Sequence, residues 1–131
     1  MDLLKMLKIY ANNIQVLHRN LIGSNWNSNH ERLQKYYEKV QECLDSMVEI
    51  LMSLGYTEPT LKESLEYVDE LEVINRSAEE SFRIVQSYFQ NIIAEMNRMI
   101  NIPNDVISKM EEYQVWFRLE ANYKLKQELG D

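Results

Sequence analysis

The chain has 131 residues, the size of one domain, and its three glycines and two prolines leave little material for the turns of a β-sandwich or barrel. Abundant helix-forming residues favour one all-α domain spanning residues 1–131. The net charge of −7, with no cluster of Lys and Arg, argues against direct DNA binding. The single Cys43, the lack of a leader after Met1 and the lack of a membrane-length apolar run predict a soluble, cytoplasmic protein with no membrane partner.

Apolar residues recur at three- and four-residue steps in four long segments, the pattern of helices that bury one face. The first predicted helix runs from Asp2 to about Ile22, and the second from Trp26 or Asn29 to Leu54. A short helix is predicted over 61–68, a third long helix from about Ser77 to Ile100, and a fourth over 104–129. The apolar faces expected for the first two helices are Leu3, Leu7, Tyr10, Ile14, Leu17 and Leu21, and Leu33, Tyr37, Val40, Leu44, Met47, Leu51 and Leu54.

Local signals set the expected boundaries of these helices. Gly23 follows the first apolar stripe and Gly55 the second, at positions where helices commonly end. The candidate caps of the second helix are Ser24, Asn25, Asn27 and Ser28. Capping-box spacing is found for Ser28 with Glu31, Thr60 with Glu63, and Ser77 with Glu80. The pattern predicts an antiparallel four-helix bundle with a short helix in the crossover between its second and third helices.

Four side chains are the candidate metal ligands. His18 and His30 are separated by the turn at Gly23, whose reversal should bring the two imidazoles together. Asp45 and Glu49 are four residues apart and therefore neighbours on one helix face. Two imidazoles with two carboxylates form a suitable ligand set for a transition metal.

One chain is unable to close this site. His30 and Asp45 lie fifteen residues apart on one predicted helix, or roughly 22 Å, whereas metal ligands bind at about 2 Å. Two copies would close it if their second helices pack antiparallel about a two-fold axis near Glu38 and Lys39. Each histidine pair would then face the carboxylates of the other chain, giving two equivalent sites per dimer.

The same residues carry a resemblance to a known family. The segment HRNLIGSNWNSNHE, from His18 to Glu31, resembles the H-x-N-x-x-G-x-x-(F/W)-x-x-x-H-E signature of the Dps-like mini-ferritins. The likeness continues through Tyr37, Asp45, Glu49, Leu54 and Gly55, the short TLKE segment from Thr60, and the EEYQVWFRLEA segment from Glu111.

The resemblance implies a ferritin-like bundle that assembles into a dodecamer from two-fold dimers. It also implies a ferroxidase site between subunits, with His18 and His30 from one chain and Asp45 and Glu49 from the other. The implied activity is oxidation of Fe(II) by hydrogen peroxide or dioxygen and storage of ferric iron, which protects against oxidative stress. Zinc or another divalent ion would also suit the ligands. Trp26, beside the site in the family motif, is expected to limit water access or to intercept oxidising equivalents.

Gln34 departs from the family pattern. Many relatives have an aspartate here that helps to hold a second iron, and a neutral amide is a poorer ligand for a hard cation. The centre could therefore be dinuclear, mononuclear or inactive. The alternative function is a structural Dps-like assembly that binds metal weakly or does not catalyse oxidation.

Overall fold

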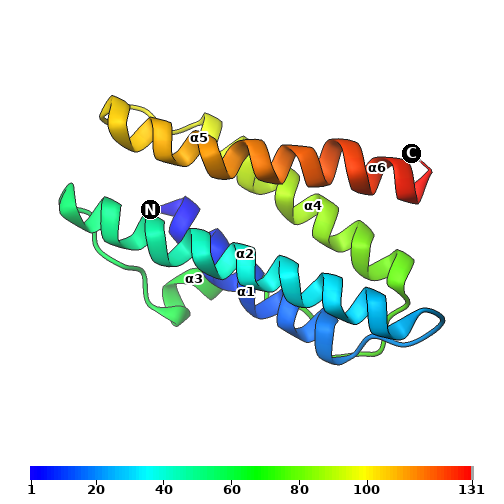
Figure 1. Ribbon diagram of the computed structural model, residues 1–131. Coiled ribbons are helices and arrows are strands. Elements are labelled where there is room, and N and C mark those ends of the chain that lie inside the picture. The colour runs from blue at the N-terminus through cyan, green and yellow to red at the C-terminus, as the bar shows by residue number, and fades with distance from the viewer. Residues whose placement is uncertain (131) are drawn as a thin grey trace. The chain divides into compact units, whose positions relative to one another are not determined.

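The computed structural model describes residues 1–130, and every regular element in that range is a helix (Figure 1). The all-α prediction is therefore confirmed for this part of the chain. The chain divides into two compact units, Met1–Ser81 and Phe82–Asp131. None of the helices within residues 1–130 has the length and apolar character needed to cross a bilayer.

The first unit contains α1 (Asp2–Arg19), α2 (Trp26–Ser53) and α3 (Leu61–Tyr67). The helices α1 and α2 lie side by side, and the short α3 packs against α1 (Figure 1). The apolar stripe predicted for the first helix is confirmed, because all six of its members are buried: Leu3, Leu7, Tyr10, Ile14, Leu17 and Leu21. Burial of this stripe supplies much of the apolar area that holds the unit together.

The first helix ends three residues earlier than predicted. Its last residue is Arg19, because the backbone that follows pairs with a distant segment. The amide of Arg76 donates to the carbonyl of Asn20 (3.2 Å), and the amide of Ile22 donates to the carbonyl of Arg76 (3.1 Å). The chain then reverses at Gly23, whose φ of +111° is a conformation that favours glycine.

Of the four candidate caps before the second helix, Asn25 is the N-cap, so the predicted start at Trp26 is confirmed and the capping box at Ser28 is wrong. The helix begins earlier than this box implies, with Asn25 as its N-cap at φ 55°, so that Ser28 lies within the first turn and donates its hydroxyl to the carbonyl of Asn25 (3.2 Å). The apolar face predicted for the second helix is wrong at two positions. Tyr36 is buried while Tyr37 is only half-buried, and Leu54 is exposed because α2 ends at Ser53.

A long connection links α2 to the next helix and contains α3, as predicted. The capping box at its start is confirmed, since Thr60 Oγ1 accepts from the amide of Glu63 (3.1 Å) and the Glu63 carboxylate accepts from the amide of Thr60 (3.3 Å). Beyond α3 the connection is held to α1 by buried Asn13. The Asn13 side chain donates to the carbonyl of Asp69 (3.1 Å) and accepts from the amide of Leu71 (2.9 Å).

The second unit contains α4 (Ala78–Asn97) from Phe82 onward and a second long helical segment. That segment comprises α5 (Asn104–Leu119), the π-helical turn η1 (Glu120–Lys124) and α6 (Leu125–Leu129). Helix α4 begins as expected, with the amide of Glu80 donating to Ser77 Oγ (3.2 Å), but it ends before the predicted Ile100.

The π-helical turn interrupts what the sequence predicts as one continuous α-helix over 104–129. A π-turn shifts the backbone hydrogen bonds by one residue and frees carbonyl groups to accept from elsewhere. Here the carbonyl of Ala121 accepts from Gln86 Nε2 of α4 (3.0 Å), and Arg83 donates to the carbonyl of Leu129 (3.2 Å). The rings of Phe89 and Phe117 lie 4.9 Å apart in the core of this unit.

Candidate metal site

The turn between α1 and α2 stacks three rings. His18 lies in the last turn of α1 and His30 in the second turn of α2, and their ring centroids are 3.8 Å apart with an interplanar angle of 27°. Trp26, the first residue of α2, stacks on His30 with centroids 4.2 Å apart and planes at 19°. The prediction that the reversal at Gly23 brings the two imidazoles together is confirmed.

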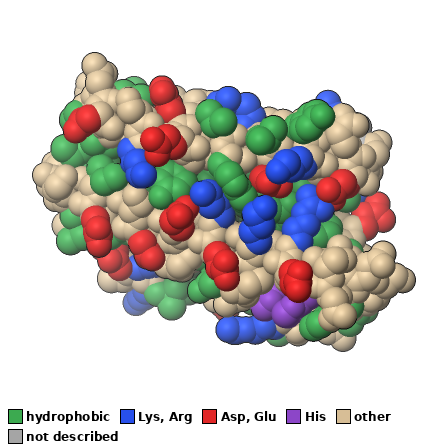
Figure 2. Space-filling model, viewed as in Figure 1, with side chains coloured by type: hydrophobic (Ala, Val, Ile, Leu, Met, Phe, Trp, Pro, Cys, Tyr) green, Lys and Arg blue, Asp and Glu red, His purple; other side chains and the backbone are tan. Residues whose placement is uncertain are grey.

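Backbone contacts fix the position of Trp26 in this stack. Its Nε1 donates to the carbonyl of Leu21 (2.9 Å), in the segment that pairs with Arg76. The indole therefore has its one polar atom satisfied, yet the side chain is 43% exposed. Part of the histidine pair also reaches the surface, where it lies beside an acidic side chain (Figure 2).

His18 is the least satisfied polar side chain in the stack. Its Nδ1 and Nε2 atoms are both buried and have no hydrogen-bond partner, and the same holds for Oε1 of Gln15, one turn earlier on α1. Burial lowers the pKa of His18, and the nearby His30 and Arg19 lower it further. At neutral pH the imidazole is therefore uncharged, the form that binds metal. A buried polar group without a partner costs about 1–3 kcal/mol, so His18 would gain from a cation or a water molecule.

The arrangement of the two imidazoles suits adjacent positions around one ion. Imidazole nitrogens bind a metal at about 2.1 Å, and two ligands at angles of 90° to 109° have their nitrogens roughly 3.0–3.4 Å apart. The two rings are stacked with centroids 3.8 Å apart and planes at 27°. Binding one ion would therefore require a nitrogen of each ring to turn towards a common point.

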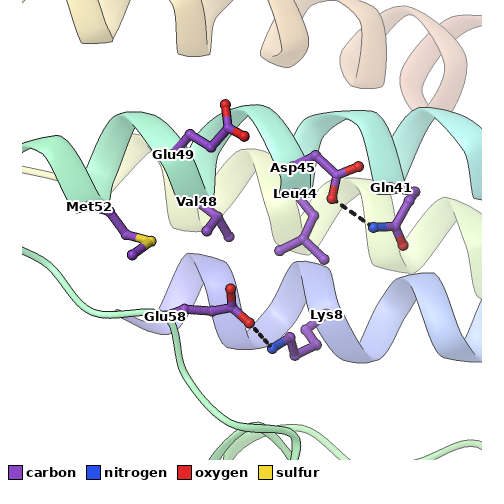
Figure 3. Close-up of a pocket in the computed structure, with 8 residues that line it drawn as sticks. All are labelled: Lys8, Gln41, Leu44, Asp45, Val48, Glu49, Met52 and Glu58. Carbon is purple, nitrogen blue, oxygen red and sulfur yellow. Dashed lines mark hydrogen bonds and ion pairs between the residues drawn. The ribbon is translucent and has the colours of Figure 1, made fainter.

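Asp45 and Glu49 are among the residues that line an open cavity of about 510 Å³, and their carboxylates point away from Lys8 and Glu58 (Figure 3). Asp45 accepts a hydrogen bond from Gln41 Nε2 (2.9 Å), one turn earlier. Lys8 of α1 is held away from these carboxylates, because its Nζ donates to Glu58 Oε2 and to the carbonyl of Pro59, both at 2.8 Å. The cavity is lined by Lys8, Gln41, Leu44, Asp45, Val48, Glu49, Met52 and Glu58.

The structure does not bring the histidines and the carboxylates of one chain together. Helix α2 is uninterrupted from His30 to Asp45, fifteen residues or roughly 22 Å along its axis. Within residues 1–130, no group of three or more His, Cys, Asp or Glu side chains is placed to hold a metal ion. The four predicted ligands thus lie on one chain as two separate pairs, which are called half-sites below because the predicted site would need both.

Two glutamines that the ligand pattern overlooks lie beside the half-sites. Gln15 is one turn before His18, and Gln41 is one turn before Asp45, so spacings of three and four residues on the predicted helices would have identified both. Gln34, the departure from the family pattern, donates its Nε2 to Glu38 Oε1 (2.9 Å). Its amide is therefore oriented by a carboxylate one turn farther along α2.

Comparison with known proteins adds evidence on the fold. No protein-family model and no curated protein matches this sequence. Among solved structures, the chain is similar to the crystal structure of Helicobacter cinaedi CAIP, with a TM-score of 0.76, 15% sequence identity, and coverage of 98% of this chain and 94% of that one. At this identity the similarity establishes a shared all-helical fold and says nothing of chemistry.

Proposed function

We propose that this protein oxidises Fe(II) at a metal site formed between two copies of the chain. His18 and His30 of one copy bind the ion together with Asp45 and Glu49 of the other. The observation that carries the proposal is that both imidazole nitrogens of His18 are buried without a hydrogen-bond partner, while the ring stacks on a second imidazole. The cavity beside Asp45 and Glu49 supports it, because both carboxylates are accessible to a second chain.

The bound iron is the substrate, and the four ligands suit its oxidation from Fe(II) to Fe(III). Neutral imidazoles bind Fe(II) well, and carboxylates favour Fe(III), so a mixed site stabilises the oxidised product. Hydrogen peroxide or dioxygen is the oxidant, and the ferric product is stored inside a shell of twelve subunits. Zinc and other divalent ions compete for the same ligands.

Trp26 has a protective role in this proposal. Its ring lies against His30, where it limits water access to one side of the site and is positioned to intercept oxidising equivalents. A Trp26→Phe variant keeps an apolar ring at this position, and we expect it to release more hydroxyl radical during Fe(II) oxidation by peroxide, measured by spin trapping. An unchanged radical yield would contradict the role.

Gln34 favours a second candidate function, a structural assembly with weak metal binding. Its amide replaces a carboxylate and is held by Glu38, which lowers the negative charge available for a second ion. In that case the bundle and the dimer persist, while oxidation is slow or absent.

Anaerobic titration with Fe(II), followed by addition of peroxide, separates the two functions. The native protein, His30→Ala and Asp45→Ala are compared, with Glu66→Ala as a control that removes an exposed carboxylate from α3. Saturable binding and rapid oxidation that are lost in both site variants and kept in the control support the ferroxidase. Binding no stronger than in buffer leaves the structural function.

Native mass spectrometry or small-angle scattering tests the assembly separately. A particle of twelve chains supports the storage function, and a two-chain particle would keep the site but remove the store. A monomer at micromolar concentration would refute the site itself, because the two half-sites of one chain lie too far apart.

A further inference from the structure

Buried polar atoms without a hydrogen-bond partner gather at one place on α1. They are Nδ1 and Nε2 of His18 and Oε1 of Gln15, and the only other such side-chain atom within residues 1–130 is Oγ of Ser81. Residues three apart on a helix are neighbours on its surface, so the two side chains share one face of α1. We infer that Gln15 is a positioning residue, whose Oε1 accepts a hydrogen bond from Nδ1–H of His18 and leaves Nε2 of that ring to bind the ion.

A count of donors and acceptors supports this pairing. A neutral imidazole has one N–H donor and one nitrogen lone pair. A histidine that binds a metal through its lone pair almost always donates its other N–H to a carboxylate, a carbonyl oxygen or a water molecule. Neither nitrogen of His18 has such a partner, and Gln15 Oε1 is an amide oxygen that lacks a donor. One bond between the two side chains satisfies both and leaves only the lone pair of the ring, which is the metal-binding atom.

The direction of helical side chains decides which nitrogen faces Gln15. Side chains on an α-helix lean towards its N-terminus, so the ring of His18 lies over the turn that carries Gln15. Nδ1 is the ring nitrogen nearer the backbone of α1, and Nε2 is the farther one. The bond therefore uses Nδ1–H, and the farther nitrogen is left for the ion.

The bond requires a movement of Gln15 rather than of His18. The ring of His18 is held by its stack on His30, with centroids 3.8 Å apart. The side chain of Gln15 is unbranched, and rotation about its torsions can turn the amide towards the ring while α1 stays in place. The rearrangement is favourable because it gives partners to two buried polar atoms that have none.

The inference rests on the proposed function, which makes His18 a metal ligand, but it predicts a property of the metal-free protein. The hydrogen bond that the ring makes sets which nitrogen carries the proton. A histidine without a specific partner favours the proton on Nε2, whereas the bond to Gln15 places it on Nδ1. The tautomer of His18 therefore reports the bond directly.

NMR of protein labelled with ¹⁵N and ¹³C only at histidine measures this tautomer. The chain has two histidines, and His30→Ala assigns their signals. Magic-angle spinning makes the measurement independent of the size of the assembly, and at about pH 8.5 the ring is uncharged. In the native protein we expect the proton of His18 on Nδ1, and in Gln15→Met, which keeps the length of the side chain but removes the acceptor, we expect it largely on Nε2.

Two further variants separate positioning from packing. Gln15→Glu retains an acceptor oxygen at the same place and should keep the native tautomer. Gln127→Met makes the same substitution at an exposed glutamine of α6 and should change nothing. Anaerobic titration with Co(II), whose visible absorption reports its ligands, gives a second readout. We expect the Kd to rise about 10- to 100-fold in Gln15→Met, as is typical when the partner of a metal-binding histidine is lost, and to recover in Gln15→Glu.

The outcomes separate this inference from the proposed function. A proton on Nδ1 in the native protein that moves only in Gln15→Met supports the positioning role even if iron is never oxidised, in which case the proposed function alone fails. A proton on Nε2 in the native protein overturns the inference, and iron oxidation by that protein would leave the proposed function standing. Weaker Co(II) binding by Gln15→Met with an unchanged tautomer would show a packing effect and also overturn the inference.

Discussion

Mixing two inactive variants tests directly whether the metal site is shared between chains. One variant carries His18→Ala and His30→Ala, and the other carries Asp45→Ala and Glu49→Ala, so that neither can form a site as a homodimer. In a mixed dimer the symmetry produces one site with all four ligands and one with none. The intact histidines come from the second variant and the intact carboxylates from the first.

The expected recovery follows from this arithmetic. Random association of equal amounts gives one half mixed dimers, each with one of its two sites intact, so about a quarter of the native number of sites should return. Because α2 holds His30 and Asp45 roughly 22 Å apart within one chain, recovery inside a single copy is excluded by the helix rise.

The assay needs subunit exchange followed by metal binding. The two variants are mixed in denaturant and refolded together, then titrated anaerobically with Fe(II), and the saturating stoichiometry is compared with native protein treated in the same way. The separately refolded variants serve as controls for residual binding. No recovery in mixed protein that is shown by mass to contain heterodimers would refute the shared site, and binding by either double variant alone would show that other ligands are involved.

Three further perturbations test parts of the structure. Gln34→Asp should raise the saturating Fe(II) stoichiometry of each site from one towards two in the same titration, because a carboxylate replaces the amide that now donates to Glu38. Thr60→Ala removes the side-chain cap of α3 and should lower the free energy of unfolding by about 1 kcal/mol in urea denaturation, whereas Thr60→Ser should be nearly neutral. The pKa of His18, measured by NMR, should lie below its usual 6.5 because of burial. The unfolded chain then binds more protons, so stability should fall as pH drops through 6.5 and level off below the lowered pKa, a dependence that His18→Ala should reduce.

Most of the helices could be predicted because apolar periodicity and capping residues act locally. The six buried residues of α1 and the cap at Thr60 follow from such signals. The errors arose where distant segments intervene. Helix α1 stops at Arg19 because Arg76, far along the chain, pairs with the backbone of Asn20 and Ile22, and the π-turn near Ala121 coincides with a bond from Gln86. No local pattern contains these pairings.

In the candidate site, too, the features that depend on local sequence could be predicted and those that depend on distant segments could not. The approach of His18 to His30 depends on one short turn and was predictable, as was the spacing of Asp45 and Glu49 on one helix face. The lack of partners for both nitrogens of His18 was not predictable, because it depends on burial by residues from several segments. That observation is also what distinguishes a potential ligand from an ordinary surface histidine.

Dividing the ligands between two chains would couple metal binding to assembly. In the proposed site each chain supplies two ligands and the symmetric partner supplies the other two, so an ion that binds the dimer more tightly than the monomer must strengthen dimerisation by the same factor. The histidine pair already stacks within one chain, so assembly needs only to position the carboxylates of the partner. A chain that fails to dimerise would then release iron, and oxidation would be confined to the assembled protein.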